Sequence, residues 1–177
     1  GTMRRIFYSR DYGLAGVCRP GKAAGMKHML ILGQGYTGSR LAAHLRAQGW
    51  RVTGARRVAE NNVISISDTS AMLAAISSAS HILSSVPPAD GCDPVLAHYA
   101  HAIGSSPALW VGYLSSTGVY GDTRGAWVDE SAPIGSGRRT DRARADADWQ
   151  ALRDDMRVFR LPGIYGPGRS AIDRVRQ

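Results

Sequence analysis

The feature that most constrains the fold is a short apolar segment that runs directly into a glycine-rich turn and then into a helical pattern. Residues 28–32 (HMLIL) are typical of a buried strand. Residues 33–38 (GQGYTG) follow at once, and residues 39–48 place their apolar side chains on one helical face before Gly49. The segment therefore predicts a strand, a tight turn and a helix in immediate succession.

The three glycines of this turn have separate physical roles in binding a dinucleotide phosphate. Gly33 allows the tight turn, Gly35 lets main-chain N–H groups approach a diphosphate, and Gly38 lets the helix pack closely on the strand. The first helical turn supplies unpaired N–H donors and a partial positive charge, so Tyr36 and Thr37 are also candidate cofactor-binding residues. The alternative interpretation is a flexible loop without a ligand.

Apolar segments and helical patterns alternate along the rest of the chain. Expected strands cover residues 50–54, 62–66, 81–86, 108–114 and 156–161, and expected helices cover residues 69–78, 93–103 and 138–153. Such alternation implies crossover connections and a parallel sheet covered on both faces. The sequence thus predicts an α/β fold, a doubly wound parallel sheet of the Rossmann type, over residues 28–177. Ligands of such sheets bind beyond the carboxyl ends of the strands, and Ser85, Val86 and Pro87 lie at the carboxyl end of the expected strand 81–86.

The segment after the second expected strand carries two arginines where a site selective for NAD would carry an acid. That acid, about 20 residues beyond the glycine turn, would hold the ribose 2′-hydroxyl. Arg56 and Arg57 stand there instead, and a guanidinium can pair with a 2′-phosphate. The pattern therefore favours NADP as cofactor, with NAD as the second choice. A solvated arginine pair on a loop is the alternative.

The first 27 residues differ in composition from the rest. They hold six lysines and arginines against one acid, so they carry +5 of the formal charge of +8. Glycines and a proline interrupt any periodicity there, and Gly1-Thr2 before Met3 is typical of a cloning remnant. We expect residues 1–27 to be an N-terminal extension that is disordered or precedes the natural start. The remaining +3 does not indicate a nucleic-acid partner.

Composition excludes several other classes of protein. The 177 residues are 44% hydrophobic and 20% charged, near the values of ordinary globular domains. No apolar run approaches the ~20 residues that span a bilayer, so no membrane association is expected. Cys18 and Cys92 are far apart and indicate reduced thiols in a cytoplasmic protein. His98 and His101 lie one helical turn apart without a third ligand at matching spacing, so no metal site is expected.

Three further segments carry a specific pattern: residues 114–122 (LSSTGVYGD), residues 127–130 (WVDE) followed by Pro133, and residues 160–169 (RLPGIYGPGR). Together with the glycine turn they resemble the extended short-chain dehydrogenases/reductases, the NAD-dependent epimerase/dehydratase family, over roughly residues 28–177. The resemblance implies a nicotinamide cofactor that contacts Pro162 and a small-molecule substrate of the nucleotide-sugar kind. A homodimer is a further expectation.

By the same resemblance, Ser116 is the hydroxyl that hydrogen-bonds the substrate oxygen, because it stands three residues before Val119. A neutral hydroxyl can donate to an oxygen that gains negative charge during hydride transfer. The alternative is that Ser116 caps a turn, as serine does in many loops.

The chain departs from the family on the next helix, where Tyr-x-x-x-Lys is usual. Residues 137–146 (GRRTDRARAD) contain neither residue. If Asp146 replaces the family's acid near the middle of this helix, Arg138 falls at the tyrosine position and Arg142 at the lysine position. Arginine stays protonated and is a poor general base, but Arg142 can bind ribose or phosphate oxygens. Otherwise these interspersed charges are typical of an exposed helix face.

Two more departures concern the third strand and the length. Ser65 stands where the family often has an adenine-contacting aspartate, and the family's C-terminal substrate domain is largely absent from the 177 residues. Tyr113, Tyr120 and Tyr165 are other candidate proton donors, which spacing does not separate. The leading hypothesis is an NAD(P)-dependent oxidoreductase or epimerase-like enzyme. The alternative, favoured by the loss of the Tyr-Lys pair, is a catalytically inactive NADP-binding sensor or scaffold.

Overall fold

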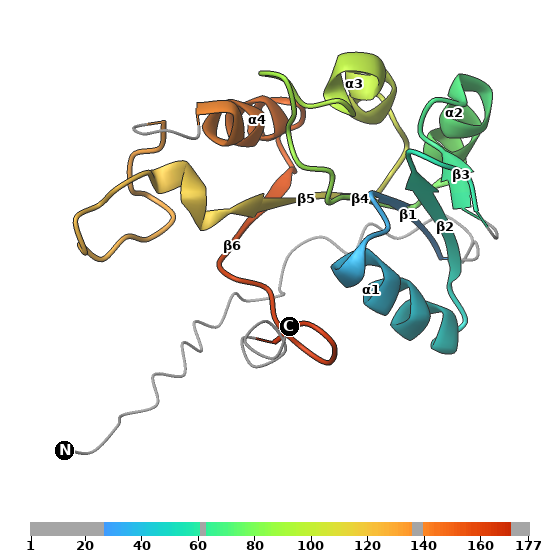
Figure 1. Cartoon of the computed structure of the whole chain (residues 1–177). Coiled ribbons are helices and arrows are strands. Elements are labelled where there is room, and N and C mark those ends of the chain that lie inside the picture. Colours follow the sequence, from blue (N-terminus) through green and yellow to red (C-terminus); the bar gives the residue numbers. More distant parts are fainter. Residues whose placement is uncertain (1–26, 61–62, 136–139, 171–177) are drawn as a thin grey trace, which may run out of the picture.

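Six strands and four α-helices form the part of the chain that the computed structural model describes, residues 27–60, 63–135 and 140–170 (Figure 1). The strands are β1 (His28–Leu32), β2 (Arg51–Arg56), β3 (Val63–Ser65), β4 (His81–Ser84), β5 (Trp110–Ser116) and β6 (Arg157–Leu161). The helices are α1 (Tyr36–Ala47), α2 (Thr69–Ser78), α3 (Leu96–Gly104) and α4 (Thr140–Ala151), with a 3₁₀ turn η1 (Thr117–Tyr120). The predicted extension, residues 1–27, lies outside the described residues except for Lys27.

All strands pair in parallel, in the order β3-β2-β1-β4-β5-β6. The order reverses at β1, where Leu32 pairs with Ala55 of β2 on one side and with Ser84 of β4 on the other. Helix α1 covers one face of the sheet, and α2, α3 and α4 cover the other (Figure 1). The doubly wound parallel sheet predicted from the sequence is therefore confirmed. Ligands of such sheets bind in the crevice at this reversal point.

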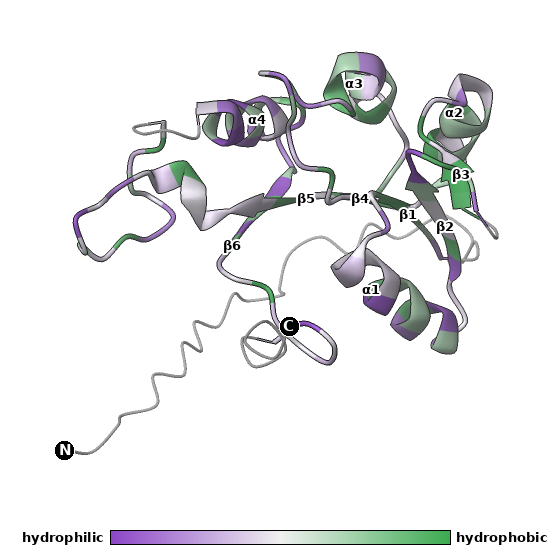
Figure 2. Ribbon diagram, in the orientation of Figure 1, coloured by the Kyte–Doolittle hydropathy of each residue, from purple (hydrophilic) through white to green (hydrophobic). Residues whose placement is uncertain are grey.

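Two of the three hydrophobic clusters among the described residues lie on opposite faces of β1, which is buried on both sides. Leu30 and Leu32 belong to the larger cluster, which also contains Trp149 of α4. Ile31 packs toward the α1 side with Leu45. A strand covered on both faces needs a continuous apolar run, which explains the sequence HMLIL. Figure 2 shows the corresponding pattern on α1, which carries both hydrophobic and hydrophilic residues around its turns.

Element boundaries follow local hydrogen bonding more closely than hydrophobic periodicity. Helix α2 begins after Asp68, whose carboxylate accepts from the Ala71 N–H at 3.0 Å, as the sequence predicts. The expected start of the third helix at Asp93 is wrong. Asp93 Oδ1 instead accepts from the N–H groups of Val95 and Leu96 (2.8 and 3.0 Å), so it caps the helix from outside.

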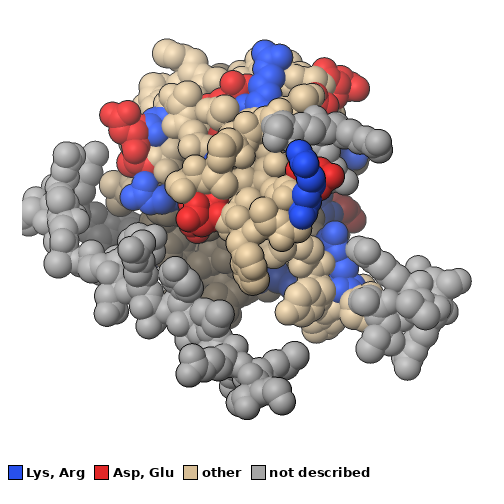
Figure 3. Space-filling model, turned by 90° about the vertical axis from the view of Figure 1, so that its left-hand side faces the viewer, with Lys and Arg blue, Asp and Glu red and all other residues tan. Residues whose placement is uncertain are grey.

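The prediction that the acids of the fourth helix are all exposed is wrong for Asp146. This side chain is fully buried, accepts from Ser115 Oγ at 2.5 Å and pairs with Arg160 Nη2 at 3.0 Å. Arg144 and Asp148 do face solvent and pair at 3.8 Å. Figure 3 shows basic and acidic side chains intermixed on the side of the molecule that carries the 121–135 loop and the β6 edge. The contacts of Asp146 with Ser115 and Arg160 therefore attach α4 to β5 and β6.

Two further findings concern the described residues alone. None of their helices combines the length and the apolar character needed to cross a bilayer. Their His, Cys, Asp and Glu side chains form no group of three or more that could hold a metal ion.

Candidate functional site

A cleft of about 1390 Å³ opens at the carboxyl ends of the strands, beside the point where the strand order reverses. It exceeds the ~300–1,000 Å³ of most small-molecule pockets. Twelve of the thirteen predicted site residues line it: Gly33, Gly35, Tyr36, Thr37, Arg56, Arg57, Ser85, Val86, Pro87, Ser116, Arg142 and Pro162. Gly38 does not. The topology thus brings together segments separated by more than 100 residues.

Gly33 and Gly38 are required by the protein's own packing. Gly33 has φ +82°, and a Cβ there would lie 2.9 Å from Val86 Cγ2. A Cβ on Gly38 would lie 3.0 Å from Ile31 Cγ2 and 3.3 Å from the Gly33 carbonyl oxygen. Gly33 therefore forms the turn, and Gly38 lets α1 approach β1.

Gly35 is different, because no neighbouring side chain requires glycine there. Its φ is −84° and its ψ −149°, and the nearest atom to an added Cβ would be the Gly33 oxygen at an ordinary 3.9 Å. Gly35 lines the cleft, so the open space beside it faces a ligand site. It is also the N-cap of α1, with no side-chain cap and no acid in the first turn. The first N–H groups of α1 therefore remain available to an anion.

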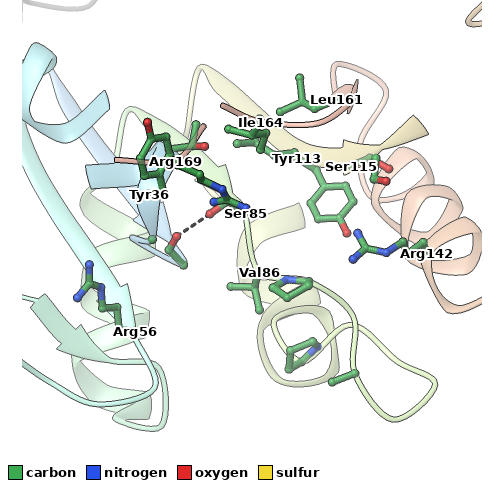
Figure 4. Close-up of a pocket in the computed structure, with 18 of the residues that line it drawn as sticks. Tyr36, Arg56, Ser85, Val86, Tyr113, Ser115, Arg142, Leu161, Ile164 and Arg169 are labelled. Atoms are coloured by element: carbon green, nitrogen blue, oxygen red, sulfur yellow. Dashed lines mark hydrogen bonds between the residues drawn. The ribbon is translucent and has the colours of Figure 1, made fainter. Parts of the chain in front are cut away.

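Ser85 and Val86 hold the glycine turn in shape. Ser85 Oγ donates to the Gly33 carbonyl at 2.6 Å (dashed in Figure 4), and its N–H donates to Leu32 O at 2.8 Å. Val86 packs against the Cα of Gly33. The sequence predicted that both residues lie along a bound nucleotide, but it did not reveal this support across 52 positions of the chain.

The two predicted arginines lie at the end of the cleft beside β2. Arg56 Nε donates to the Gln34 carbonyl at 2.5 Å, and its Nη1 lies 3.6 Å from Glu60 Oε2. Arg57 lines the same end and is exposed. Sequence reasoning missed Glu60, which the loop after β2 brings into the cleft. No local pattern signals it, because residues 57–60 form a loop, in which an i,i+4 spacing does not bring two side chains together as it does on a helix.

Ser116 acts as the turn cap that was the alternative interpretation, while its side chain also lines the cleft. Its Oγ accepts from the Gly118 N–H at 3.0 Å and so caps η1. Accepting leaves its own proton free to donate. Its neighbour Ser115 is not free in this way, because Ser115 Oγ donates to the buried Asp146.

Of the three candidate tyrosines, the geometry favours Tyr113. Its buried ring stacks on Trp149, with centroids 5.2 Å apart and planes 10° apart. Its hydroxyl points toward the guanidinium of Arg142, which enters the cleft from α4 (Figure 4). Tyr120 is occupied by Arg160, which donates to its hydroxyl at 3.0 Å, and Tyr165 is 83% exposed.

Burial is the main reason that the pKa of the Tyr113 hydroxyl is raised well above its usual range, and the carboxylate of Asp93 raises it further. The charge of Arg142 acts in the opposite direction. Tyr113 therefore keeps its proton at neutral pH.

No protein-family model and no curated protein matches the chain. Among solved structures, it is similar to a functionally unknown conserved protein from Silicibacter pomeroyi (36% identity, TM-score 0.69, 85% of this chain and 57% of the other). It is also similar to a protein provisionally named an NAD-dependent epimerase/dehydratase, from Methylobacillus flagellatus (28%, TM-score 0.64, 82% and 57%). WbmH from Bordetella bronchiseptica, solved with NAD⁺, shares the fold (18%, TM-score 0.65, 83% and 59%).

In fold the chain is thus similar to proteins that include one provisionally named an NAD-dependent epimerase/dehydratase. It spans 57–59% of the length of these three solved structures. The chain departs from the Tyr-x-x-x-Lys pattern that the resemblance implies, because α4 contains neither tyrosine nor lysine. Arg142, which the resemblance places at the lysine position, enters the cleft, whereas Arg138 lies outside the described residues.

Proposed function

We propose that the cleft binds a nicotinamide dinucleotide, with NADP(H) preferred, and that the domain serves an oxidoreductase or epimerase-like enzyme. The observation that carries this proposal is Gly35. Its packing does not require glycine, and a side chain there would fill the open space in front of the uncapped α1 N-terminus. That space fits an anionic diphosphate, which would accept from the main-chain N–H groups.

The two ends of the cleft suit the two ends of such a cofactor. Arg56 and Arg57 would hold the 2′-phosphate, and together with Glu60 they leave this end with a net positive charge. Val86 and Pro87 would lie along the nucleotide between the ends. When bound, the nicotinamide would supply or accept a hydride.

The chain's own contribution to the chemistry would come from side chains at the opposite end. Ser116 has a free proton to donate to a substrate oxygen, and the protonated Tyr113 offers a second donor. Arg142 would bind ribose or phosphate oxygens as a fixed cation. The substrate class we propose is a sugar nucleotide, in keeping with MoeE5, a structure of similar fold solved with UDP-glucose and NAD (20% identity, TM-score 0.58).

The absence of tyrosine and lysine from α4 favours a second candidate, an NADP-binding sensor without turnover. The two functions differ in one measurement. An enzyme oxidises NADPH in the presence of a carbonyl or UDP-sugar panel, whereas a sensor binds NADPH and leaves it unchanged.

The test of cofactor binding uses Gly35→Ser, titrated calorimetrically with NADPH and NADH. Serine is a favourable N-cap, so α1 and the melting temperature should be preserved or improved. Binding should nevertheless weaken at least about tenfold, because the side chain occupies the cradle and caps the N–H groups. Gly104→Ala, whose Cβ would meet only ordinary contacts with Leu152, is the matched control. Unchanged NADPH affinity in Gly35→Ser would refute the proposal that the diphosphate binds beside Gly35.

A further inference from the structure

The segment after β6, residues 162–170, ends in a tight turn; we call this segment the strap. Gly166 and Arg169 exchange main-chain hydrogen bonds in both directions, at 3.0 and 2.8 Å. Gly168, between them, has φ +73°. The turn is therefore closed on itself, and its shape fixes where the Arg169 side chain begins.

Helix α1 holds the strap in place through its first turn. Tyr36 Oη donates to the Pro167 carbonyl at 3.2 Å, and Arg40 Nη2 donates to the same oxygen at 2.8 Å. The contact is close, because a Cβ on Gly166 would come within 2.4 Å of Tyr36 Oη. Two donors and a steric fit thus fasten the strap to the helix that carries the glycine turn.

Arg169 extends from the strap into the cleft. Its guanidinium carbon lies 5.4 Å from the centroid of the Tyr36 ring, and Figure 4 shows it beside Ser85, next to the glycine turn. Arg40 also lies over the Tyr36 ring, at 4.5 Å, but does not line the cleft. Within the described part of the chain, no carboxylate lies within ion-pair distance of Arg169. Among the described residues, Arg169 is therefore a cation without a counter-ion beside the N-terminus of α1.

We propose that Arg169 is a diphosphate-binding residue, which the strap positions beside Gly35 and the N-terminus of α1. This inference rests on the dinucleotide site proposed above. Main-chain N–H groups supply only partial charge, whereas a guanidinium adds a full charge and a planar fork that matches phosphate oxygens. Stacking on Tyr36 orients the fork before a ligand arrives.

The test compares Arg169→Ala with Arg46→Ala, a matched loss of one arginine from the last turn of α1, away from the cleft. The probes are NADPH and adenosine 2′-monophosphate, which lacks a diphosphate. Arg169→Ala should weaken NADPH binding about 10- to 100-fold and leave adenosine 2′-monophosphate unchanged. Arg46→Ala should change neither. Equal NADPH affinities of the two variants, or a loss of both ligands in Arg169→Ala, would overturn the inference.

Delivery by the strap is tested separately with Gly166→Ala, which keeps Arg169 but forces the strap or Tyr36 to move. NADPH affinity should fall, and Tyr36→Phe in the same chain should restore part of it, because the crowding oxygen is removed while Arg40 still donates to the Pro167 carbonyl. Failure of this rescue refutes the steric fit of Gly166 against Tyr36. A wild-type protein that binds neither NADPH nor NADH refutes the proposed function itself, whereas normal NADPH binding by Arg169→Ala refutes only the role of Arg169.

Discussion

The buried ion pair between α4 and β6 gives the sharpest stability prediction. Asp146 is fully buried, and Arg160, whose side chain is 13% exposed, donates to both of its carboxylate oxygens at 3.0 and 3.2 Å. The hydrogen bond to Asp146 is the main reason that the pKa of Arg160 is raised further above its usual range. Replacing Asp146 by alanine would therefore leave a mostly buried cation without its counter-ion.

The expected cost follows from this geometry. Removing one partner of a buried pair typically destabilises a protein by 3–5 kcal/mol. Arg160 keeps its hydrogen bonds to Tyr120 and to the Glu130 carbonyl, so we expect the lower end, about 3 kcal/mol. For a chain of this size, that loss corresponds to a fall in melting temperature of about 6–12 °C.

Differential scanning calorimetry of three variants checks this reasoning. Asp148→Ala removes an acid from the same helix, but its pair with Arg144 is exposed, so we expect a change of less than about 2 °C. Adding Arg160→Met to Asp146→Ala removes the stranded charge and should recover part of the loss. If Asp146→Ala melts within 2 °C of Asp148→Ala, the ion pair does not stabilise the attachment of α4.

Three further predictions concern charge and protons. Glu60→Gln should tighten NADPH binding several-fold and leave NADH unchanged, because it removes the carboxylate beside Arg56; weaker NADPH binding in calorimetry would contradict the assignment of this end. Burial lowers the pKa of His28 in the folded protein below its usual 6.5. The contribution of neutral His28 to the free energy of unfolding is therefore fully present above about pH 6.5 and decreases as the pH falls below it. Between about pH 7.5 and 5.5, the melting temperature of His28→Gln should therefore fall by less than that of the wild type. An equal fall in both proteins would contradict this prediction. Tyr113→Phe should retain NADPH binding but lose NADPH-dependent reduction in a spectrophotometric assay; full turnover would exclude Tyr113 as proton donor.

Sequence reasoning succeeded where the determinants are local. The glycine turn, β1 and the start of α2 at Thr69 each depend on residues within a few positions of one another. The alternation of apolar segments also sufficed for the doubly wound sheet, because each crossover is decided by its own strand and helix.

The features that the sequence did not predict depend on contacts between segments that are distant along the chain. Asp146 looked like one of several helical surface acids, and only its pairing with Arg160 on β6 and Ser115 on β5 shows why it is buried. Likewise, three tyrosines were equivalent in sequence. Strand pairing places Tyr113 of β5 beside Ser84 of β4, and packing on Trp149 directs its ring into the cleft. No spacing rule contains that information.

The hydroxyl groups and the carboxylate of the cleft lie at opposite ends. Tyr113 and Ser116 present hydroxyl groups at one end, so this end can donate hydrogen bonds to a bound ligand. Among the described residues that line the cleft, the carboxylate is that of Glu60, which lies beside Arg56 at the other end. A general base must lie within hydrogen-bond reach of the proton that it takes. Glu60 is therefore not placed to act as a base on a ligand group held by Tyr113 and Ser116.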